Sequence, residues 1–493
     1  MSTILWLLFL ASCVTTAWMH YADSQDKGSS SIVFPSSVVS APAATAHRDR
    51  NADRLHRPYF HAVEALFAVS TRLNALLGSH AEGNVLFSPV TTTTALAELL
   101  LGARGSTRSQ ILNILTAANR TNDTAEATAA EFHQHLNSLL RNLKTSAVFD
   151  NSYYLHLSSA FFFRLGLSPF SSFINAATEL YAMDLFYLDF GGDPSGSLEI
   201  LNRWAALNTL GAIDRVFSHP LPATTAAVLT NAIYFKGAWE TPFNSQYTVP
   251  GKFKYNDTDS LDVQFMRGQF NLKYSESHRL GCRLVCIPYK HGQAAMYAIL
   301  PDTGDMYNIH QFATGLSLDD FTELVDSATT TSVTLIMPKM RLAQNFSIRK
   351  AFSLLQKQAE SQIQEERFSS NPHQNNTDES ELTCCSSNCS ENCQGFCTSE
   401  DRDVNSDEGS FSFNMSGITN HKNFQINDII EHVFLDVDEA GTVAAAVGST
   451  LVDYSGEFKD FKMDRPFLFF IKHEITGSLL FWGIIVDPTN GNA

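Results

Sequence analysis

The sequence predicts an α+β fold in which helices pack around large β-sheets. Two observations support this prediction. In the first third of the chain, apolar residues recur every three or four positions, which is typical of helices. Apolar and β-branched runs become frequent later, which is typical of strands. The 493 residues are 44% hydrophobic and include 36 Phe, so the chain has ample material for a core.

Two stretches at the start of the chain are expected to lie outside the folded domain. Residues 1–17 resemble a secretory signal peptide, because a short apolar run at Ile4–Leu10 is followed by small residues. The run is too short to span a bilayer, so we expect cleavage after Ala17, with an uncleaved anchor as the alternative. Residues 18–57 are rich in Ser, Ala and Pro, then basic, and lack periodicity, which predicts a disordered tail.

Helices and a first strand are expected in the next part of the chain. Helical spacing begins at Tyr59 and continues to Leu77, and a leucine stripe recurs from Leu136 to Leu143. A short strand at Asn84–Ser88 ends where a helix cap is expected, before Pro89. Two further helices are predicted at Ala95–Leu101 and Ile111–Leu115.

The strands that follow are apolar runs of strand length. Val228–Phe235 is almost continuously apolar, which favours a strand buried on both faces. The C-terminal part reads as a hairpin that turns at Thr476-Gly477. The other predicted strands are Tyr153–Leu157, Met296–Leu300, Val333–Met337, Phe467–Ile471 and Leu479–Val486.

One internal segment, at about residues 360–410, does not fit either pattern. It is polar, acidic and aperiodic, which predicts an inserted surface loop. It contains Cys384, Cys385, Cys389, Cys393 and Cys397, and with Cys282 and Cys286 there are seven cysteines after signal removal. In a secreted chain this composition favours disulfides, and the spacing lacks the CxxC pair of a zinc site, so no metal is expected.

Charge and sequons favour an extracellular glycoprotein. The formal net charge of −17 argues against general nucleic-acid binding. No segment after the signal has an apolar run long enough to cross a membrane. Asn-X-Ser/Thr sequons, the acceptors of N-glycans, occur at Asn119, Asn122, Asn256, Asn345, Asn375, Asn388 and Asn414.

Five motifs follow one another along residues 58–493, outside the insertion. They are Asn84–Val90 with Leu101–Thr107, Thr230–Phe243, Leu335–Met340, Asp438–Thr450, and Asp464–Phe467 with Leu480–Gly483 and Asp487–Thr489. Together they give the chain a specific resemblance to the serpin family, and the extracellular vertebrate branch around antitrypsin and heparin cofactor looks most similar. The resemblance implies helices packed around three β-sheets, with an exposed reactive-centre loop.

The resemblance implies a secreted serine protease inhibitor that is not itself an enzyme and needs no cofactor. A protease would cleave the loop, form an acyl-enzyme, and be trapped when the loop inserts into the central sheet. A hinge made of small residues suits insertion, because a glycine lets the backbone turn and small side chains are easily buried. The hinge residues are Glu439, Gly441, Thr442, Ala444, Ala445 and Ala446.

The bond that the protease would cleave is predicted as one of two neighbours. The family's spacing, about sixteen residues beyond Glu439, implies Ser455–Gly456, whereas Tyr454–Ser455 fits a chymotrypsin-like specificity and is favoured. No Arg or Lys occupies either position, which disfavours trypsin- and thrombin-like targets.

The resemblance also implies where the central sheet would open. Ser88, Pro89 and Asn231 match the shutter of the family, and Trp239 matches the breach beneath the loop. One position departs from the family, because Glu431 stands where a shutter histidine is usual. A buried glutamate there would need a partner.

Partners and alternatives follow from the same reading. A serine protease is the expected partner of a chain that we expect to be monomeric. Glycosaminoglycan binding is not favoured, because the candidate helix offers only Arg141 and Lys144 as fixed cations. The alternatives are a non-inhibitory hormone carrier and a peptide precursor similar to angiotensinogen.

Overall fold

The structure is a computed structural model, and the residues it describes are 60–78, 83–116, 125–149, 153–256, 258–302, 309–351, 413–422, 424–442 and 458–489. The expected signal, tail and Cys-rich insertion lie outside these residues. The helices are α3 (Phe60–Gly78), α4 (Pro89–Gly102), α5 (Gly105–Leu115), α6 (Ala125–Phe149), α7 (Ser171–Tyr181), α8 (Pro194–Asn208), α9 (Ile309–Gly315) and α10 (Leu318–Asp326).

The strands fall into two groups. The first comprises β2 (Tyr153–Arg164), β3 (Asp184–Leu188), β4 (Ala227–Ala238), β10 (Met340–Ser347), β11 (Asp428–Val437) and β12 (Gly441–Thr442). The second comprises β1 (Val85–Phe87), β5 (Val249–Lys254), β6 (Ser260–Ser277), β7 (Cys282–Pro288), β8 (Ala294–Pro301), β9 (Thr329–Pro338), β13 (Lys459–Lys462), β14 (Phe467–His473) and β15 (Leu479–Ile485).

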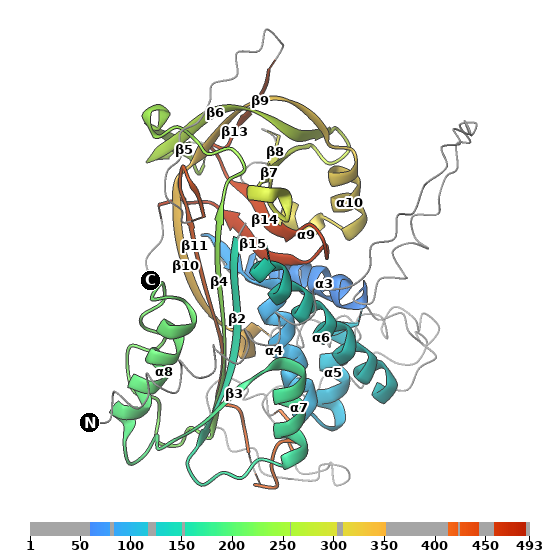
Figure 1. Ribbon diagram of the computed structural model, residues 1–493, viewed down its shortest axis with the longest axis vertical. Helices are drawn as coiled ribbons and strands as arrows, with labels where there is room; N and C mark the ends of the chain where they lie inside the picture. The colour runs from blue at the N-terminus through green and yellow to red at the C-terminus, as the bar shows by residue number, and fades with distance from the viewer. Residues whose placement is uncertain are drawn as a thin grey trace, which may run out of the picture. The chain divides into compact units, whose positions relative to one another are not determined.

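The first group forms a six-stranded sheet in the order β10-β11-β4-β2-β3, with β12 paired to β4. Its long central strands run almost parallel to the long axis in Figure 1. Residues Ala227–Phe235 of β4 are all buried, as expected for a strand covered on both faces. Strand β2 continues past the predicted Leu157 to Arg164, because Phe161, Phe162 and Phe163 also pack into the core.

The second group forms one continuous sheet, in the order β1-β15-β14-β8-β7-β6-β9-β13 with β5 beside β6. The family resemblance implied three sheets, and the described residues form two. The reason is that β6 is 18 residues long and pairs with different strands at its two ends, which joins two expected sheets into one. Its start pairs with β5 at Ser260–Phe265, and its end pairs with β7 at Lys273–Ser277.

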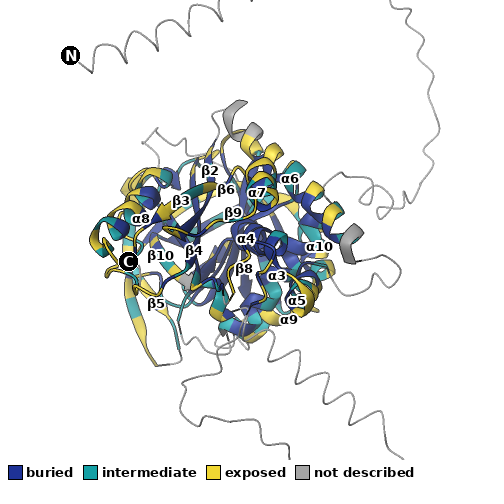
Figure 2. Ribbon diagram, turned by 90° about the horizontal axis from the view of Figure 1, so that it is seen from below, coloured by how far each residue is buried: buried dark blue, intermediate teal, exposed yellow. Residues whose placement is uncertain are grey.

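Helix α4 lies at the centre of the molecule. All but one of its residues are buried, and it contacts both sheets through β4, β11 and β15. Helix α8 covers the opposite face of the six-stranded sheet (Figure 1). There, Trp204 packs edge-on against Phe162. Figure 2 shows the same layering, with buried residues at the centre and exposed residues on the outer faces of α8 and α10.

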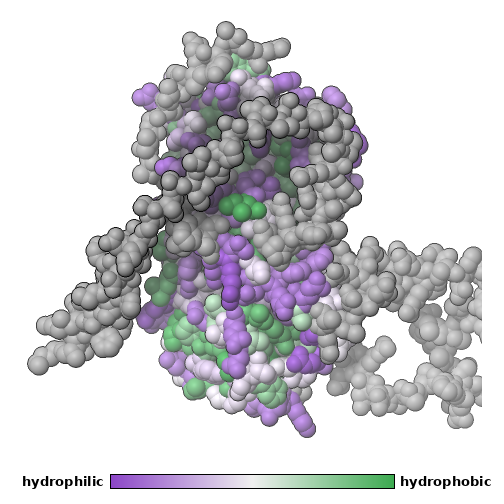
Figure 3. All heavy atoms as spheres, turned by 45° about the vertical axis from the view of Figure 1, so that its right-hand side comes forward, coloured by the Kyte–Doolittle hydropathy of each residue, from purple (hydrophilic) through white to green (hydrophobic). Residues whose placement is uncertain are grey.

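The surface of the described residues is mixed in character. On the face drawn in Figure 3, hydrophilic side chains run between hydrophobic ones. Exposed large apolar side chains include Leu165, Leu207 and Leu210. Within the described part of the chain, no helix is both long enough and apolar enough to cross a membrane.

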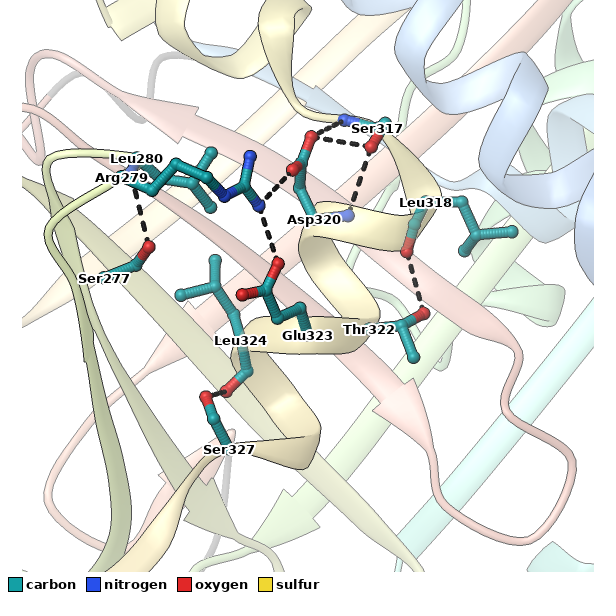
Figure 4. Close-up of polar contacts among 10 residues, drawn as sticks. All are labelled: Ser277, Arg279, Leu280, Ser317, Leu318, Asp320, Thr322, Glu323, Leu324 and Ser327. Carbon is teal, nitrogen blue, oxygen red and sulfur yellow. Dashed lines mark hydrogen bonds and ion pairs between the residues drawn. The ribbon is translucent and has the colours of Figure 1, made fainter. Parts of the chain in front are cut away.

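Helix α10 is tied to the turn between β6 and β7 by polar contacts (Figure 4). Ser317 and Asp320 form a capping box: the Ser317 hydroxyl accepts from the Asp320 N–H at 3.1 Å, and the Asp320 carboxylate accepts from the Ser317 N–H at 3.0 Å. Arg279 then donates to Asp320 at 2.6 Å and to Glu323 at 2.7 Å. The start of α10 is therefore fixed both by its own cap and by Arg279 from the turn between β6 and β7.

Candidate functional site

Strands β4 and β11 are paired only along part of their length. They run parallel in register from Asp428 opposite Val228 to Val433 opposite Ile233. Beyond Ile233, β4 continues to Ala238 without a partner from β11, and pairs on that side with β12. The six-stranded sheet, which we call the central sheet, therefore has a gap between β4 and β11 at the end where the hinge begins.

A tight turn brings the hinge back into this opening. The N–H of Asp438 donates to the carbonyl of Gly441 at 2.9 Å, and the Asp438 carboxylate accepts from the N–H of Ala440 at 2.8 Å. Gly441 and Thr442 then pair antiparallel with Ala238 and Gly237 of β4. Two residues of the hinge thus already belong to the central sheet.

Gly441 occupies a position that other residues would find difficult. Its φ of +144° lies in a region that favours glycine. A Cβ at Gly441 would lie 2.2 Å from the carbonyl oxygen of Gly237 and 2.7 Å from the Cα of Ala238. Only a residue without a side chain allows the hinge to approach β4 so closely.

Thr442 and Trp239 are both buried beneath this turn. The hydroxyl of Thr442 lies 2.9 Å from the phenol oxygen of Tyr289. The Tyr289 ring stacks on Trp239, whose indole N–H donates to the carbonyl of Asp438 at 3.0 Å. The breach tryptophan predicted from the sequence therefore supports the turn directly.

Glu439 is held by two side chains that sequence reasoning did not assign to the site. The ammonium of Lys339 donates to Oε2 of Glu439 at 2.8 Å, and the hydroxyl of Thr248 donates to Oε1 at 2.7 Å. Burial raises the pKa of Glu439, but these hydrogen bonds outweigh it and leave the pKa below its ordinary value. Lys339 belongs to the motif Leu335–Met340, so the sequence did contain a signal that could have drawn attention to it.

Ser88 and Pro89, two of the predicted shutter residues, lie at the start of α4 beside Glu431, at the paired part of β4 and β11. Glu431 is fully buried, and its Oε1 accepts from the Ser88 N–H at 2.8 Å and from the Thr91 hydroxyl at 2.6 Å. Its Oε2 accepts from the Thr92 hydroxyl. Ser88 is also the N-cap of α4, and Pro89 follows at its first turn. The partner that a buried glutamate needs is therefore the N-terminus of α4.

A second buried glutamate, Glu98, lies within helix α4 itself. Asn231 donates to Glu98 Oε2 at 3.3 Å from the β4 side. Burial raises the pKa of Glu98, and equally that of Glu431, to about 7. Sequence reasoning missed Glu98, although it is the single acid in the apolar run Ala95–Leu101.

The neighbouring His432 faces away from this network. It is buried, and its Nδ1 lies 2.6 Å from Oδ1 of Asn345 on β10. Burial lowers the pKa of His432 to about 4, so the ring is neutral near pH 7. His432 therefore does not replace the shutter histidine, because its side chain points to the other face of the sheet from Glu431.

Several predicted residues lie outside the described part of the chain. They include the reactive-bond residues and three hinge alanines: Tyr454, Ser455, Gly456, Ala444, Ala445 and Ala446. The same holds for the sequons at Asn119, Asn122, Asn375 and Asn388. The sequons at Asn345 and Asn414 are exposed, and Asn256 is half-buried.

The two described cysteines are buried and free. Cys282 and Cys286 lie on the same strand, β7, four residues apart. Strand geometry separates such residues by about 13 Å, which is too far for a disulfide between them. Burial raises the pKa of the Cys286 thiol to about 11 and that of Cys282 to about 12, so neither is a reactive thiolate near pH 7.

Comparisons with known proteins agree with this architecture. The family model described as "Serpin (serine protease inhibitor)" matches residues 65–370 and 409–488. The chain is 27% identical over 415 residues to leukocyte elastase inhibitor of Xenopus tropicalis, covering 83% of this chain and 94% of that protein. It is 24% identical to serine protease inhibitor 28Dc of Drosophila melanogaster, covering 84% and 77%. These two relatives are named as protease inhibitors, not as enzymes.

Solved structures share the fold. Human glycosylated kallistatin matches with a TM-score of 0.68 and 26% identity, covering 88% of this chain and all of that chain. A thyroxine complex of thyroxine-binding globulin matches with a TM-score of 0.67, but its 20% identity extends only to the fold. Relatives from vertebrates and arthropods match at similar identity, so the finer placement in the extracellular vertebrate branch stays a prediction. The family itself is shown: this chain is a member of the serpins.

Proposed function

We propose that this serpin is a secreted inhibitor of serine proteases that traps its target by inserting the cleaved loop into the six-stranded sheet. The observation that carries the proposal is the two-residue strand β12, which already pairs with β4. Two hinge residues are thus already paired with β4, and insertion of the loop would lengthen β12 along the same strand.

The register of β12 specifies the expected product. Continuing the pairing of Gly441 with Ala238 and of Thr442 with Gly237 would place Val443 opposite Lys236 and Val452 opposite Ala227. The loop segment 443–452 therefore matches the remaining length of β4, which begins at Ala227. A complete set of ladder hydrogen bonds would be gained along the whole strand.

Insertion requires β4 and β11 to separate. The six residue pairs between Asp428/Val228 and Val433/Ile233 would be replaced by pairs to the inserted loop. The alternation of side chains along a strand puts Ala444 and Ala446 on the same inner face as the buried Thr442. Small side chains at these positions favour burial without a steric cost.

The target is proposed from the residue before the cleaved bond. A hydrophobic specificity pocket, as in chymotrypsin, would accept Tyr454, whereas a small one, as in elastase, would accept Ser455. The two frog relatives are named as inhibitors of leukocyte elastase, so Ser455–Gly456 remains the alternative cleavage site. We favour cleavage at Tyr454–Ser455 by a chymotrypsin-like protease.

Incubation of the full chain with chymotrypsin and with leukocyte elastase tests the function. We expect an SDS-resistant complex with chymotrypsin, and mass spectrometry of the released C-terminal peptide should identify the cleaved bond. The cleaved chain should also unfold at a higher temperature than the intact chain. A cut loop without a complex and without this rise would reject inhibition; saturable binding of a small apolar ligand by the intact chain would then favour the carrier.

Two matched substitutions separate insertion from mere cleavage. Thr442→Arg would place a cation at a position that is fully buried beneath the sheet, so the variant should be cleaved without forming the complex. Val443→Arg would face outward by strand alternation and should keep most of the trapping. Equal behaviour of the two variants would contradict insertion in the proposed register.

The remaining parts of the proposal concern environment and partners. Secretion is supported by the signal-like residues 1–17 and by exposed sequons such as Asn345 and Asn414. A glycosaminoglycan partner is not favoured, since Arg141 and Lys144 are the only fixed cations in the α6 sequence. We expect the secreted protein to act as a monomer, which size-exclusion chromatography with light scattering would test.

A further inference from the structure

Three side chains with metal-binding atoms meet where helices α3 and α6 pack together. His61 comes from the first turn of α3, and Glu131 and His135 come from one face of α6, four residues apart. One ligand atom from each residue can be chosen so that all three lie within 4.8 Å of one another. All three side chains are half-buried, so an ion could reach them from solvent.

The two nitrogens of His61 face different carboxylates. Its Nε2 lies 3.9 Å from Oε1 of Glu131, and its Nδ1 lies 3.4 Å from Oε2 of Glu64. In metal sites, a ligating histidine usually donates its second ring N–H to a carboxylate, which fixes the tautomer and the ring orientation. Glu64 stands in this orienting position, one turn after His61 on α3.

We propose that His61, Glu131 and His135 form a binding site for a divalent transition-metal ion of the Zn²⁺ class, with Glu64 orienting His61. Two imidazoles and one carboxylate are ligands that Zn²⁺ accepts readily, whereas Ca²⁺ and Mg²⁺ prefer oxygen ligands only. Tetrahedral bonds of about 2.1 Å place ligand atoms roughly 3.4 Å apart. The rings of His61 and His135 are stacked with centroids 5.2 Å apart, so they would have to turn for a nitrogen of each to face one ion. Water would fill the fourth position.

None of the three ligands is a hinge or shutter residue, so the existence of the site does not depend on protease inhibition. Its ligands come from helices that are some seventy residues apart in the sequence, and for this reason no local motif predicts it. A bound ion would link the first turn of α3 to α6. We therefore expect slower amide exchange in both segments when the metal is present.

Isothermal titration of the metal-free full chain with ZnCl₂ tests the site. His61→Ala, His135→Ala and Glu131→Gln should each weaken one binding event at least about tenfold or abolish it. Glu64→Gln should weaken the same event less. The matched control is His278→Ala, which removes an exposed histidine in the turn before β7 and should leave binding unchanged.

A second readout distinguishes this site from the cysteines and histidines elsewhere in the chain. Co²⁺ bound by imidazole and carboxylate should give d–d absorption without a thiolate-to-cobalt charge-transfer band, and His61→Ala should remove that absorption. The proposal is overturned if wild-type protein binds no Zn²⁺, or if all three ligand variants, folded by circular dichroism, bind it as the wild type does. A thiolate band that persists in His61→Ala would assign the metal to cysteines instead.

Discussion

The N–H of Ser88 donates to Oε1 of Glu431 at 2.8 Å, which joins the start of helix α4 to the strand that must move aside for an inserting loop. Thr91 and Thr92 donate to the same carboxylate from the first turn of α4. The contacts fall at the paired part of β4 and β11, since Glu431 lies opposite Asn231. The charge of this one carboxyl group should therefore influence how firmly the sheet is closed.

Stability should fall as the pH rises through the range in which Glu431 ionises. Burial raises the folded-state pKa of Glu431 from 4.5 to about 7, so the folded chain holds this proton more tightly than the unfolded chain. The resulting stabilisation is fully present below about pH 4.5 and is lost as the pH rises through 7; its size is on the order of 3 kcal/mol. Urea unfolding at pH 5 and pH 8 should show this decline.

Glu431→Gln is the variant that isolates the effect. A neutral amide can still accept from Ser88 and Thr91, while its NH₂ donates to Thr92, whose hydroxyl reverses its role. The variant should be more stable than wild type at pH 8 and less dependent on pH. Glu98→Gln on helix α4 is the comparison variant: burial raises the pKa of Glu98 to about 7 as well, so each single variant should remove part of the pH dependence and the double variant should remove more. An unchanged pH slope in Glu431→Gln would contradict the assignment.

The ion pair between Lys339 and Glu439 should hold the hinge turn in place. Glu439→Lys would replace two hydrogen bonds by two neighbouring cations, with a loss of about 2 kcal/mol. The exchange Lys339→Glu with Glu439→Lys should restore most of this loss, because the attraction is re-formed with reversed signs.

Amide hydrogen exchange measures the turn itself. The N–H groups of Trp239 and Phe243 donate to the carbonyls of Ala440 and Glu439, so a released turn should accelerate exchange in both. Equal exchange rates in wild type, single variant and double exchange would show that the pair does not secure the hinge.

The sequence points to hinge and shutter residues through local signals, and their roles in loop insertion stay predictions. Gly441 followed by small residues is a continuous motif, and Ser88-Pro89 is a helix start that can be read directly. The partners of these residues could not be found in this way. Thr91 lies 340 positions from Glu431, and Lys339 lies 100 positions from Glu439, so only the packed sheet brings them together. The joining of two expected sheets through β6 likewise depends on long-range pairing.

Helix α10 provides a stability test that should leave the hinge unaffected. Ser317→Ala removes the hydroxyl that accepts the N–H of Asp320 and should lower stability by about 1 kcal/mol, because an N–H in the first turn loses its acceptor (Figure 4). Ser317→Asp keeps an acceptor and should recover much of the loss. A lower unfolding midpoint with an unchanged amount of protease complex is expected; loss of the complex would link α10 to trapping.

Gly441→Ala should release β12 from the central sheet, because two obstacles act together. The backbone conformation at φ +144° is unfavourable for alanine, and the new Cβ would collide with the Gly237 carbonyl at 2.2 Å. Gly211→Ala is the matched control, since Gly211 also has a positive φ, +78°, but no atom lies within 4 Å of the added Cβ. Both variants should lose about 1 kcal/mol through backbone strain, whereas only Gly441→Ala should expose the N–H of Trp239 to rapid exchange. If the two variants exchange alike at Trp239, the close approach of Gly441 to β4 does not hold the hinge in the sheet.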